Sequence, residues 1–192
     1  MKKLIVRIAE GLGNQLFMYS HAYALSKKLG YTLFLDNSSG YFKIKNRLRN
    51  YELDKFDISA TLCNDKDKFD TYSKDFKRKI LKIVDKIKDD KSFYLEKTYK
   101  DKTTSYQSLS NKKFSNKLIT EGYFQSEKYF LDYTSDLKKE FKIKSNYLNN
   151  SNKYIELLKR NNSVSICIRQ NRYSEGKIKD NIKSNEFTQN TI

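Results

Sequence analysis

The sequence predicts an α/β fold with a mainly parallel sheet. A short apolar run at residues 4–8 precedes a glycine-containing turn, a helix-like segment follows the turn, and a second apolar run begins at Tyr31. Two further strand-like runs, 118–124 and 164–168, each follow a segment with helical periodicity. Because a strand, a helix and a second strand in this order form a crossover unit, we expect neighbouring strands to lie parallel.

The first 36 residues make the clearest unit. Residues 4–8 are nearly all apolar, as in a strand buried on both faces. Apolar side chains surround most of the circumference of a helix over 14–29, so we expect this helix to be well buried. Gly30 stands where a C-cap glycine belongs. The β-branched and aromatic run 31–35 predicts the second strand.

A second helix is predicted over 74–91 from a stripe of apolar residues at helical spacing: Phe76, Ile80, Ile83, Val84 and Ile87. Lysines occupy the other face. We expect the stripe to pack on the domain and the lysines to face water. The alternative is a basic amphipathic helix that lies on an anionic membrane.

Later elements follow the same alternation. A strand at 118–124 precedes a helix whose apolar residues are spaced by four between Tyr129 and Phe141. A short helix is predicted to end at Arg160, before the strand at 164–168. Residues 37–73 carry no firm assignment.

Composition limits the functional classes. The 192 residues include 39 Lys and Arg against 23 Asp and Glu, a formal charge of +16, with 32 Lys, 7 Arg and no Pro or Trp. This profile is typical of an A/T-rich coding sequence, so we interpret most of the charge as a solvated lysine surface. A basic protein that binds nucleic acid or a membrane surface stays open as an alternative. Because no nucleic-acid motif is recognisable, we expect no nucleic-acid partner.

The sequence lacks the residues that several types of functional site require. No apolar run approaches the ~18–20 residues of a membrane span, and Arg7 interrupts the first one, so we expect no cleaved leader. Cys63, Cys167 and the single His21 do not have the spacing of a disulfide framework, a zinc site or a catalytic triad. We expect both cysteines to be small hydrophobes in a reducing compartment, and His21 to be packed rather than catalytic.

Three polar clusters come directly after predicted strands. They are Gly11-Leu12-Gly13-Asn14-Gln15, Gln125-Ser126-Glu127 and Arg169-Gln170-Asn171-Arg172. In open α/β sheets, ligands bind outside the carboxyl ends of the strands. The sequence therefore predicts a ligand site where these clusters meet, with Asn14 and Arg169 facing one cleft.

The glycine turn and Arg169 both suit an anion. Gly11 and Gly13 open a helix whose first N–H groups can approach a phosphate, and a guanidinium at a strand end can grip one bidentately. A dinucleotide fingerprint would need a third glycine where Leu16 stands, although Asp36 has the place of its ribose-binding acid. A nucleotide-binding Rossmann module stays open as an alternative, as does a tight structural turn.

These residues resemble glycosyltransferase family 11, the α-1,2-fucosyltransferases that use GDP-fucose. The segment Gly11-Leu12-Gly13-Asn14-Gln15-Leu16-Phe17-Met18-Tyr19 is similar to the opening signature of that family. Three more segments follow in the family's order: 51–56, similar to its Tyr-x-Leu-x-x-Phe; 122–130, similar to its Gly-Tyr-aromatic-Gln-Ser-Glu-Lys-Tyr-Phe; and 164–173, in the place of its His-x-Arg-Arg-Gly-Asp-Tyr.

The last motif departs from the family's pattern. Arg169 keeps the first arginine, whereas the histidine, the second arginine, the glycine and the aspartate are replaced by Cys167, Gln170, Asn171 and Arg172. Any role that the family gives to that aspartate is therefore not carried over. Near the N-terminus, Glu10 replaces the first of the family's usual paired glycines.

The resemblance implies a GT-B fold, in which two Rossmann-like domains face each other across a cleft. Residues 1–162 would form the acceptor-side domain, and 163–192 the start of the GDP-sugar-binding domain. We therefore expect a truncated member that, by itself, neither binds GDP-fucose at micromolar concentration nor transfers fucose.

The reaction implied is inverting transfer of L-fucose from GDP-fucose to the 2-hydroxyl of a galactoside, without an obligatory metal. Arg169 would be catalytic, by balancing the charge on the leaving diphosphate, with Arg172 beside it. The donor would also contact Gly11, Gly13, Asn14 and Gln15. Glu10 and Glu127 are the candidates for the general base. Such an enzyme would build surface glycans from the cytoplasm, in peripheral contact with the inner membrane.

Overall fold

The computed structural model describes residues 1–43, 49–97, 106, 107, 109, 112–148, 152–164 and 166. The chain divides into two compact units, Met1–Leu148 and Asn149–Ile192. The first unit contains the sheet. In the second unit, the described residues form helix α4 (Asn152–Arg160), where a short helix ending at Arg160 was predicted. The predicted domain boundary at 162/163 stays a prediction.

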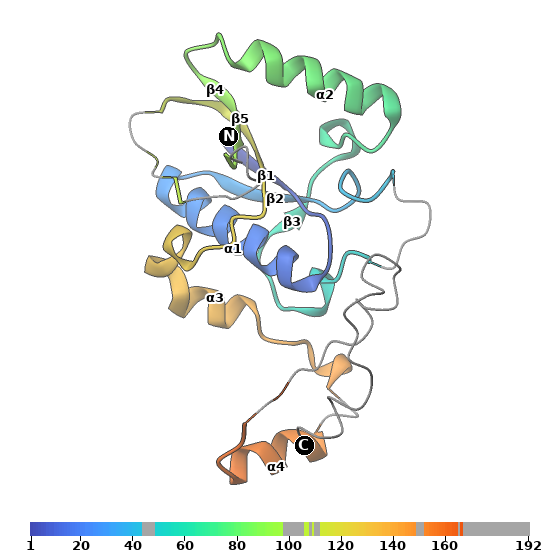
Figure 1. The fold of residues 1–192 in the computed structure, drawn as a ribbon, viewed down its shortest axis with the longest axis vertical. Helices are drawn as coiled ribbons and strands as arrows, with labels where there is room; N and C mark the ends of the chain where they lie inside the picture. The colour runs from blue at the N-terminus through green and yellow to red at the C-terminus, as the bar shows by residue number, and fades with distance from the viewer. Residues whose placement is uncertain are drawn as a thin grey trace, which may run out of the picture. The chain divides into compact units, whose positions relative to one another are not determined.

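The first unit is built on a sheet of five parallel strands (Figure 1). The strand order in the sheet is β3-β2-β1-β5-β4. This confirms the predicted α/β class and makes the unit Rossmann-like. The strands are β1 (Lys3–Arg7), β2 (Thr32–Asp36), β3 (Thr61–Leu62), β4 (Lys91–Leu95) and β5 (Phe114–Glu121).

The first β-α-β unit forms as predicted. Helix α1 (Leu12–Leu29) joins β1 to β2, which pair in parallel with Val6 opposite Leu35. Gly30 ends the helix in the left-handed conformation at φ 67°, and the Tyr31 N–H donates to the Ser26 carbonyl at 2.9 Å. This pattern closes the last helical turn, and glycine adopts it without steric cost.

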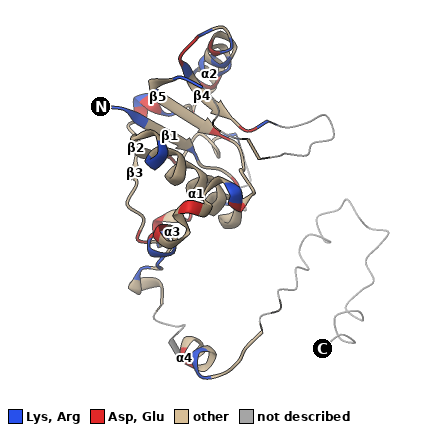
Figure 2. Ribbon diagram, turned by 90° about the vertical axis from the view of Figure 1, so that its left-hand side faces the viewer, with Lys and Arg blue, Asp and Glu red and all other residues tan. Residues whose placement is uncertain are grey.

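Two helical layers cover the sheet (Figures 1 and 2). Successive strand residues point to opposite faces, so Leu4 and Val6 join the core beneath α1, while Ile5 joins the core on the other face. The short helix α3 (Thr134–Glu140) adds Leu137 to the α1 side. Helix α2 (Tyr72–Asp85) lies over the opposite face.

Several predicted boundaries are wrong. The strand predicted at 118–124 begins at Phe114 and ends at Glu121, because Gly122 (φ 151°) and Phe124 (φ 51°) turn the chain. The helix predicted over 74–91 ends at Asp85, whose carboxylate accepts hydrogen bonds from the N–H groups of Ser92 and Phe93 at the start of β4. The strand β4 itself was not predicted.

The C-terminal part of the prediction is altered too. One helix was predicted between Tyr129 and Phe141. The structure instead has two 3₁₀ turns, Glu127–Tyr129 and Leu131–Tyr133, followed by the short helix α3. In the strand predicted at 164–168, Val164 and Ile166 are not in a strand, and the other three residues lie outside the described part of the chain.

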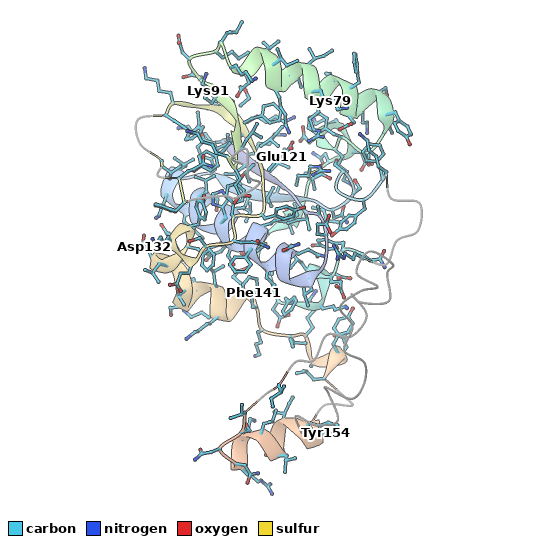
Figure 3. The ribbon with its side chains drawn as sticks, in the orientation of Figure 1. Lys79, Lys91, Glu121, Asp132, Phe141 and Tyr154 are labelled. Carbon is cyan, nitrogen blue, oxygen red and sulfur yellow. The ribbon has the colours of Figure 1, made fainter. Side chains whose placement is uncertain are left out.

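Helix α2 has the opposite orientation to the prediction. The apolar stripe of α2, which consists of Tyr72, Phe76, Ile80, Ile83, Val84 and Ile87, faces outward. Phe76 is 65% exposed and Ile83 is 66% exposed. The inner face carries charged side chains, because Arg78 and Lys82 pair with Glu121 at the end of β5. Figure 3 labels Glu121 on the sheet side of α2.

The loop after β2 packs directly on the backbone after β1. A Cβ at Gly40 would lie 2.0 Å from the Ile8 carbonyl oxygen and 2.7 Å from the Ala9 Cβ. Neither neighbour is the flexible end of a side chain, so any side chain at position 40 must displace the loop. The close approach of this loop to the end of β1 therefore requires glycine.

We predict that Gly40→Ala lowers the free energy of unfolding by about 2–3 kcal/mol, the cost of overpacking against backbone. Gly13→Ala is the matched control, because a Cβ there meets no atom within 4 Å. Urea unfolding followed by circular dichroism measures both. Equal stability of the two variants would contradict the close packing of this loop.

Candidate ligand site at the carboxyl edge of the sheet

Two of the three predicted polar clusters meet at the carboxyl ends of β1 and β5. Asn14 lies in the first turn of α1, and Gln125 lies in the loop after β5. The Gln125 Nε2 donates to the Asn14 Oδ1 at 2.6 Å across 111 residues of sequence. The third cluster, with Arg169 and Arg172, lies outside the described residues, so the predicted meeting of Asn14 and Arg169 stays a prediction.

Gln15 faces the protein interior and is fully buried. Its Nε2 donates to the carbonyl oxygens of Glu10 at 2.8 Å and Asn50 at 2.7 Å. Its Oε1 accepts from the Glu52 N–H at 2.9 Å. The amide therefore holds the β1–α1 turn against segment 50–52. Its expected contact with a donor stays a prediction.

Glu10 has an unusual backbone conformation in this turn. Its φ is 65°, which for a residue with a side chain costs about 1–3 kcal/mol. The Glu10 carbonyl accepts from the Tyr41 hydroxyl at 3.0 Å, which helps to hold the turn. Its carboxylate pairs with the Arg49 guanidinium and is 30% exposed. The turn therefore presents an oriented carboxylate.

Glu96 fixes the loop on the other side of the site. Its carboxylate accepts from the N–H groups of Tyr123 at 2.6 Å and Phe124 at 2.9 Å. A Cβ at Gly122 would lie 2.3 Å from the Glu96 Cβ, so this contact requires glycine. Glu96, which directly follows β4, was not predicted as a site residue, because no element was predicted between the end of the predicted helix at Lys91 and the strand at 118–124.

Tyr123 lies among the charges of both loops. Partial burial raises the pKa of its phenol, the negative charges of Glu10 and Glu96 raise it further, and Arg7 opposes them. We call the group of Arg7, Glu10, Asn14, Arg49, Glu96, Tyr123 and Gln125 the edge cluster. It offers guanidinium, amide, hydroxyl and carboxylate groups together, which can donate and accept hydrogen bonds to a polyhydroxylated ligand.

The remaining predicted residues have distinct positions. Gly13 is exposed with open space beside it, and Gly11 lies close to the Arg49 side chain. Glu127 is exposed at the start of a 3₁₀ turn. Asp36 is buried, and its Oδ1 accepts from the N–H groups of Ser38 and Ser39 at 3.2 and 3.0 Å, so it shapes its own loop. No three His, Cys, Asp or Glu side chains in the described ranges are arranged to hold a metal ion.

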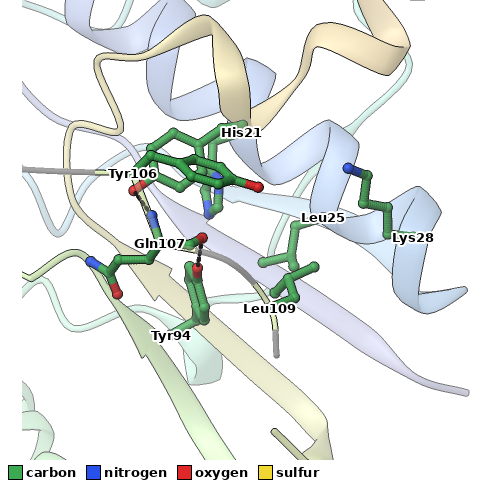
Figure 4. A pocket seen from close by; sticks show the side chains of 8 residues that line it. His21, Leu25, Lys28, Tyr94, Tyr106, Gln107 and Leu109 are labelled. Atoms are coloured by element: carbon green, nitrogen blue, oxygen red, sulfur yellow. Dashed lines mark hydrogen bonds between the residues drawn. The ribbon is translucent and has the colours of Figure 1, made fainter. Parts of the chain in front are cut away.

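His21 lies in the interior, away from solvent, as predicted. Its ring stacks on Phe124 with centroids 3.6 Å apart, and burial lowers its pKa to about 3. It borders a cavity of about 20 Å³, which has room for one water molecule (Figure 4). The imidazole is therefore neutral and packed.

A larger cavity, of about 200 Å³, lies at the amino end of β2 beside Thr32, away from the edge cluster.

The buried Cys63 likewise fits its predicted role as a small hydrophobe. Burial is the main cause that raises the pKa of its thiol, to about 12. At this pKa the thiolate is scarce at neutral pH, so the group is a poor nucleophile. Cys167 lies outside the described residues.

Comparison with known proteins finds a distant glycosyltransferase. The chain is 29% identical over 173 residues to the α-1,2-colitosyltransferase of Escherichia coli, an alignment that covers 90% of this chain and 56% of that protein. The chain thus spans about half the length of this curated relative. No family model and no solved structure matches the chain. The predicted resemblance is therefore supported as a distant relationship to a glycosyltransferase.

We predict that His21→Phe flattens the pH dependence of stability. In the unfolded chain His21 titrates near pH 6.5, whereas in the folded chain its pKa is about 3. Between these values the unfolded chain binds more protons, so stability falls as the pH falls from 6.5 toward 3. At pH 5 this loss is about 2 kcal/mol relative to pH 7.

Urea unfolding of wild type and His21→Phe at both pH values measures the difference. The variant keeps the ring stack and removes the titrating group, and its loss between pH 7 and pH 5 should be smaller by that amount. An identical pH dependence in the two proteins would contradict the lowered pKa, because His21 would then titrate in the folded chain as it does in the unfolded chain.

Proposed function

We propose that this chain is a glycosyltransferase of the α-1,2-fucosyl/colitosyltransferase type, acting on a GDP-linked deoxy sugar and a galactoside acceptor. The observation that supports it best is the hydrogen bond between Asn14 and Gln125. It joins, at the carboxyl edge, the two described segments whose sequences resemble glycosyltransferase family 11 most closely. The relationship to the colitosyltransferase supports the same activity.

The proposed architecture is GT-B, with residues 1–162 as the acceptor-side domain and 163–192 as the start of the donor-side domain. The five-stranded parallel sheet is the scaffold that such a domain requires. Because the chain spans 56% of its relative, the activity, the substrates and the partners of the whole protein are part of this proposal.

The reaction proposed is an in-line displacement with inversion. The 2-hydroxyl oxygen of the galactoside attacks the anomeric carbon of the donor, its proton passes to a carboxylate, and the bond from the anomeric carbon to the diphosphate oxygen breaks. The electron pair leaves with GDP, and we assign Arg169, with Arg172, to balance the charge on the diphosphate. The donor's contacts with Gly11, Gly13, Asn14 and Gln15 are part of this proposal.

Glu10 is the general base that we propose. Its carboxylate lies in the edge cluster, is partly exposed and is oriented by Arg49, as a base held by a third group should be. Glu127, the other candidate, is exposed on a 3₁₀ turn beyond Gln125. The positive φ of Glu10 places its side chain beside Arg49, while its carbonyl oxygen accepts hydrogen bonds from the side chains of Gln15 and Tyr41.

We predict that lactose, as a minimal galactoside, perturbs the backbone amides of Glu10–Gln15 and Tyr123–Gln125 in a heteronuclear NMR titration. Asn14→Ala should weaken this binding about fivefold, the cost of one hydrogen-bonding group. Asn116→Ala, an exposed asparagine near the amino end of β5, is the control and should bind as wild type does.

The proposal fails if lactose causes no shifts, or if the shifts map to the cavity beside Thr32 instead. Repeating the titration with maltose, which contains no galactose, tests the sugar class. Equal binding of lactose and maltose would contradict a galactoside site.

A further inference from the structure

The apolar stripe of α2 is exposed along a described helix and the turn that follows it. Its residues, from Tyr72 to Ile87, span 15 residue steps, or about 22 Å at the helical rise. Phe76 and Ile83 are two-thirds exposed, and Ile87 is 86% exposed. A contiguous apolar surface of this kind marks an interaction site on a folded protein.

The inner face of α2 explains why the stripe cannot turn inward. Asp75 pairs with Lys43 and Arg78, and these ion pairs lower the pKa of its carboxyl to about 2 against the effect of burial. Arg78 and Lys82 both pair with Glu121 of β5. Turning the helix would leave the buried Glu121 carboxylate without partners, at a cost of several kcal/mol.

The charges of α2 are sorted between its two sides. Within 72–88 both acidic residues, Asp75 and Asp85, are buried against the domain. The exposed charges of this segment are four lysines, Lys77, Lys79, Lys86 and Lys88, which flank the stripe. The outer surface of α2 therefore combines large apolar side chains with positive charge and carries no exposed carboxylate before Asp89.

This combination favours a lipid surface over a protein partner. Lysine is depleted in protein–protein interfaces. At a bilayer surface, by contrast, aliphatic and aromatic side chains enter the acyl boundary while lysines reach up to anionic headgroups. Each lysine near such a surface contributes about 1 kcal/mol. Among the described residues no helix is long and apolar enough to span a membrane.

We propose that helix α2 docks the protein on an anionic phospholipid surface, with the apolar stripe in the headgroup–acyl boundary and Lys77, Lys79, Lys86 and Lys88 on the headgroups. This inference rests on α2 alone and stands apart from the proposed transferase activity. The partner of this outer face is the lipid surface itself, which supplies both an apolar phase for the stripe and negative charge for the lysines.

A tryptophan reporter tests the proposal, because the chain has no tryptophan of its own. In Phe76→Trp the indole replaces a ring that is already exposed, so the fold should not change. Vesicles of phosphatidylcholine with phosphatidylglycerol should shift the emission of this variant to shorter wavelength, and vesicles of phosphatidylcholine alone should not. The control, Leu131→Trp, places the indole at another exposed position outside α2 and should show no shift.

Vesicle co-sedimentation of the full chain separates the stripe from the net charge of +16. Phe76→Ser with Ile83→Ser should weaken binding at least tenfold, since two apolar side chains leave the bilayer. Lys138→Gln with Lys139→Gln, two exposed lysines of α3, should not weaken it comparably. Equal binding by wild type and the serine variant, or no binding by wild type to the anionic vesicles, would overturn the proposal.

Discussion

The side-chain amide of Gln15 is the constraint on which the candidate site depends. From the first turn of a buried helix it bonds to the carbonyls of Glu10 and Asn50 and to the N–H of Glu52. The Gln15 side chain is fully buried, so leaving a polar atom of its amide unpaired would cost about 1–3 kcal/mol. The amide thereby fixes a turn that includes a residue at positive φ, and this turn presents Glu10 and Asn14 together.

A second constraint acts on the opposite face of the sheet. Glu121 ends β5 with its carboxylate beneath α2, where Arg78 and Lys82 pair with it. These pairs set which side of α2 faces inward. As a result the apolar stripe of α2 is left exposed, and Lys77, Lys79, Lys86 and Lys88 fall on the same outward side. The acid at the end of one strand thus controls the surface chemistry of a helix that is distant in sequence.

Local sequence patterns predict the first strand–helix–strand unit of the sheet, but they do not predict the contacts of Gln15 and Glu121. The β1–α1–β2 unit, the Gly30 cap and the meeting of the Asn14 and Gln125 clusters follow from periodicity and from the geometry of parallel sheets. The inversion of α2 does not, because its cause, Glu121, lies about forty residues away from Arg78. β4 was missed because the helix was predicted to continue to Lys91, where β4 begins, and no strand was recognised in the residues that follow. Glu96 was missed with it, since its role comes from the bonds that it accepts in a distant loop.

The exchange rate of the Glu52 backbone amide tests the central claim most directly. This N–H donates to the Gln15 side chain, so Gln15→Met, which keeps the bulk and removes the amide, should release it. The account predicts that hydrogen exchange at Glu52 becomes at least tenfold faster in the variant while amides in β1 and β5 stay protected. An unchanged exchange rate at Glu52 would contradict it, because the turn and segment 50–52 would then be held by something other than Gln15.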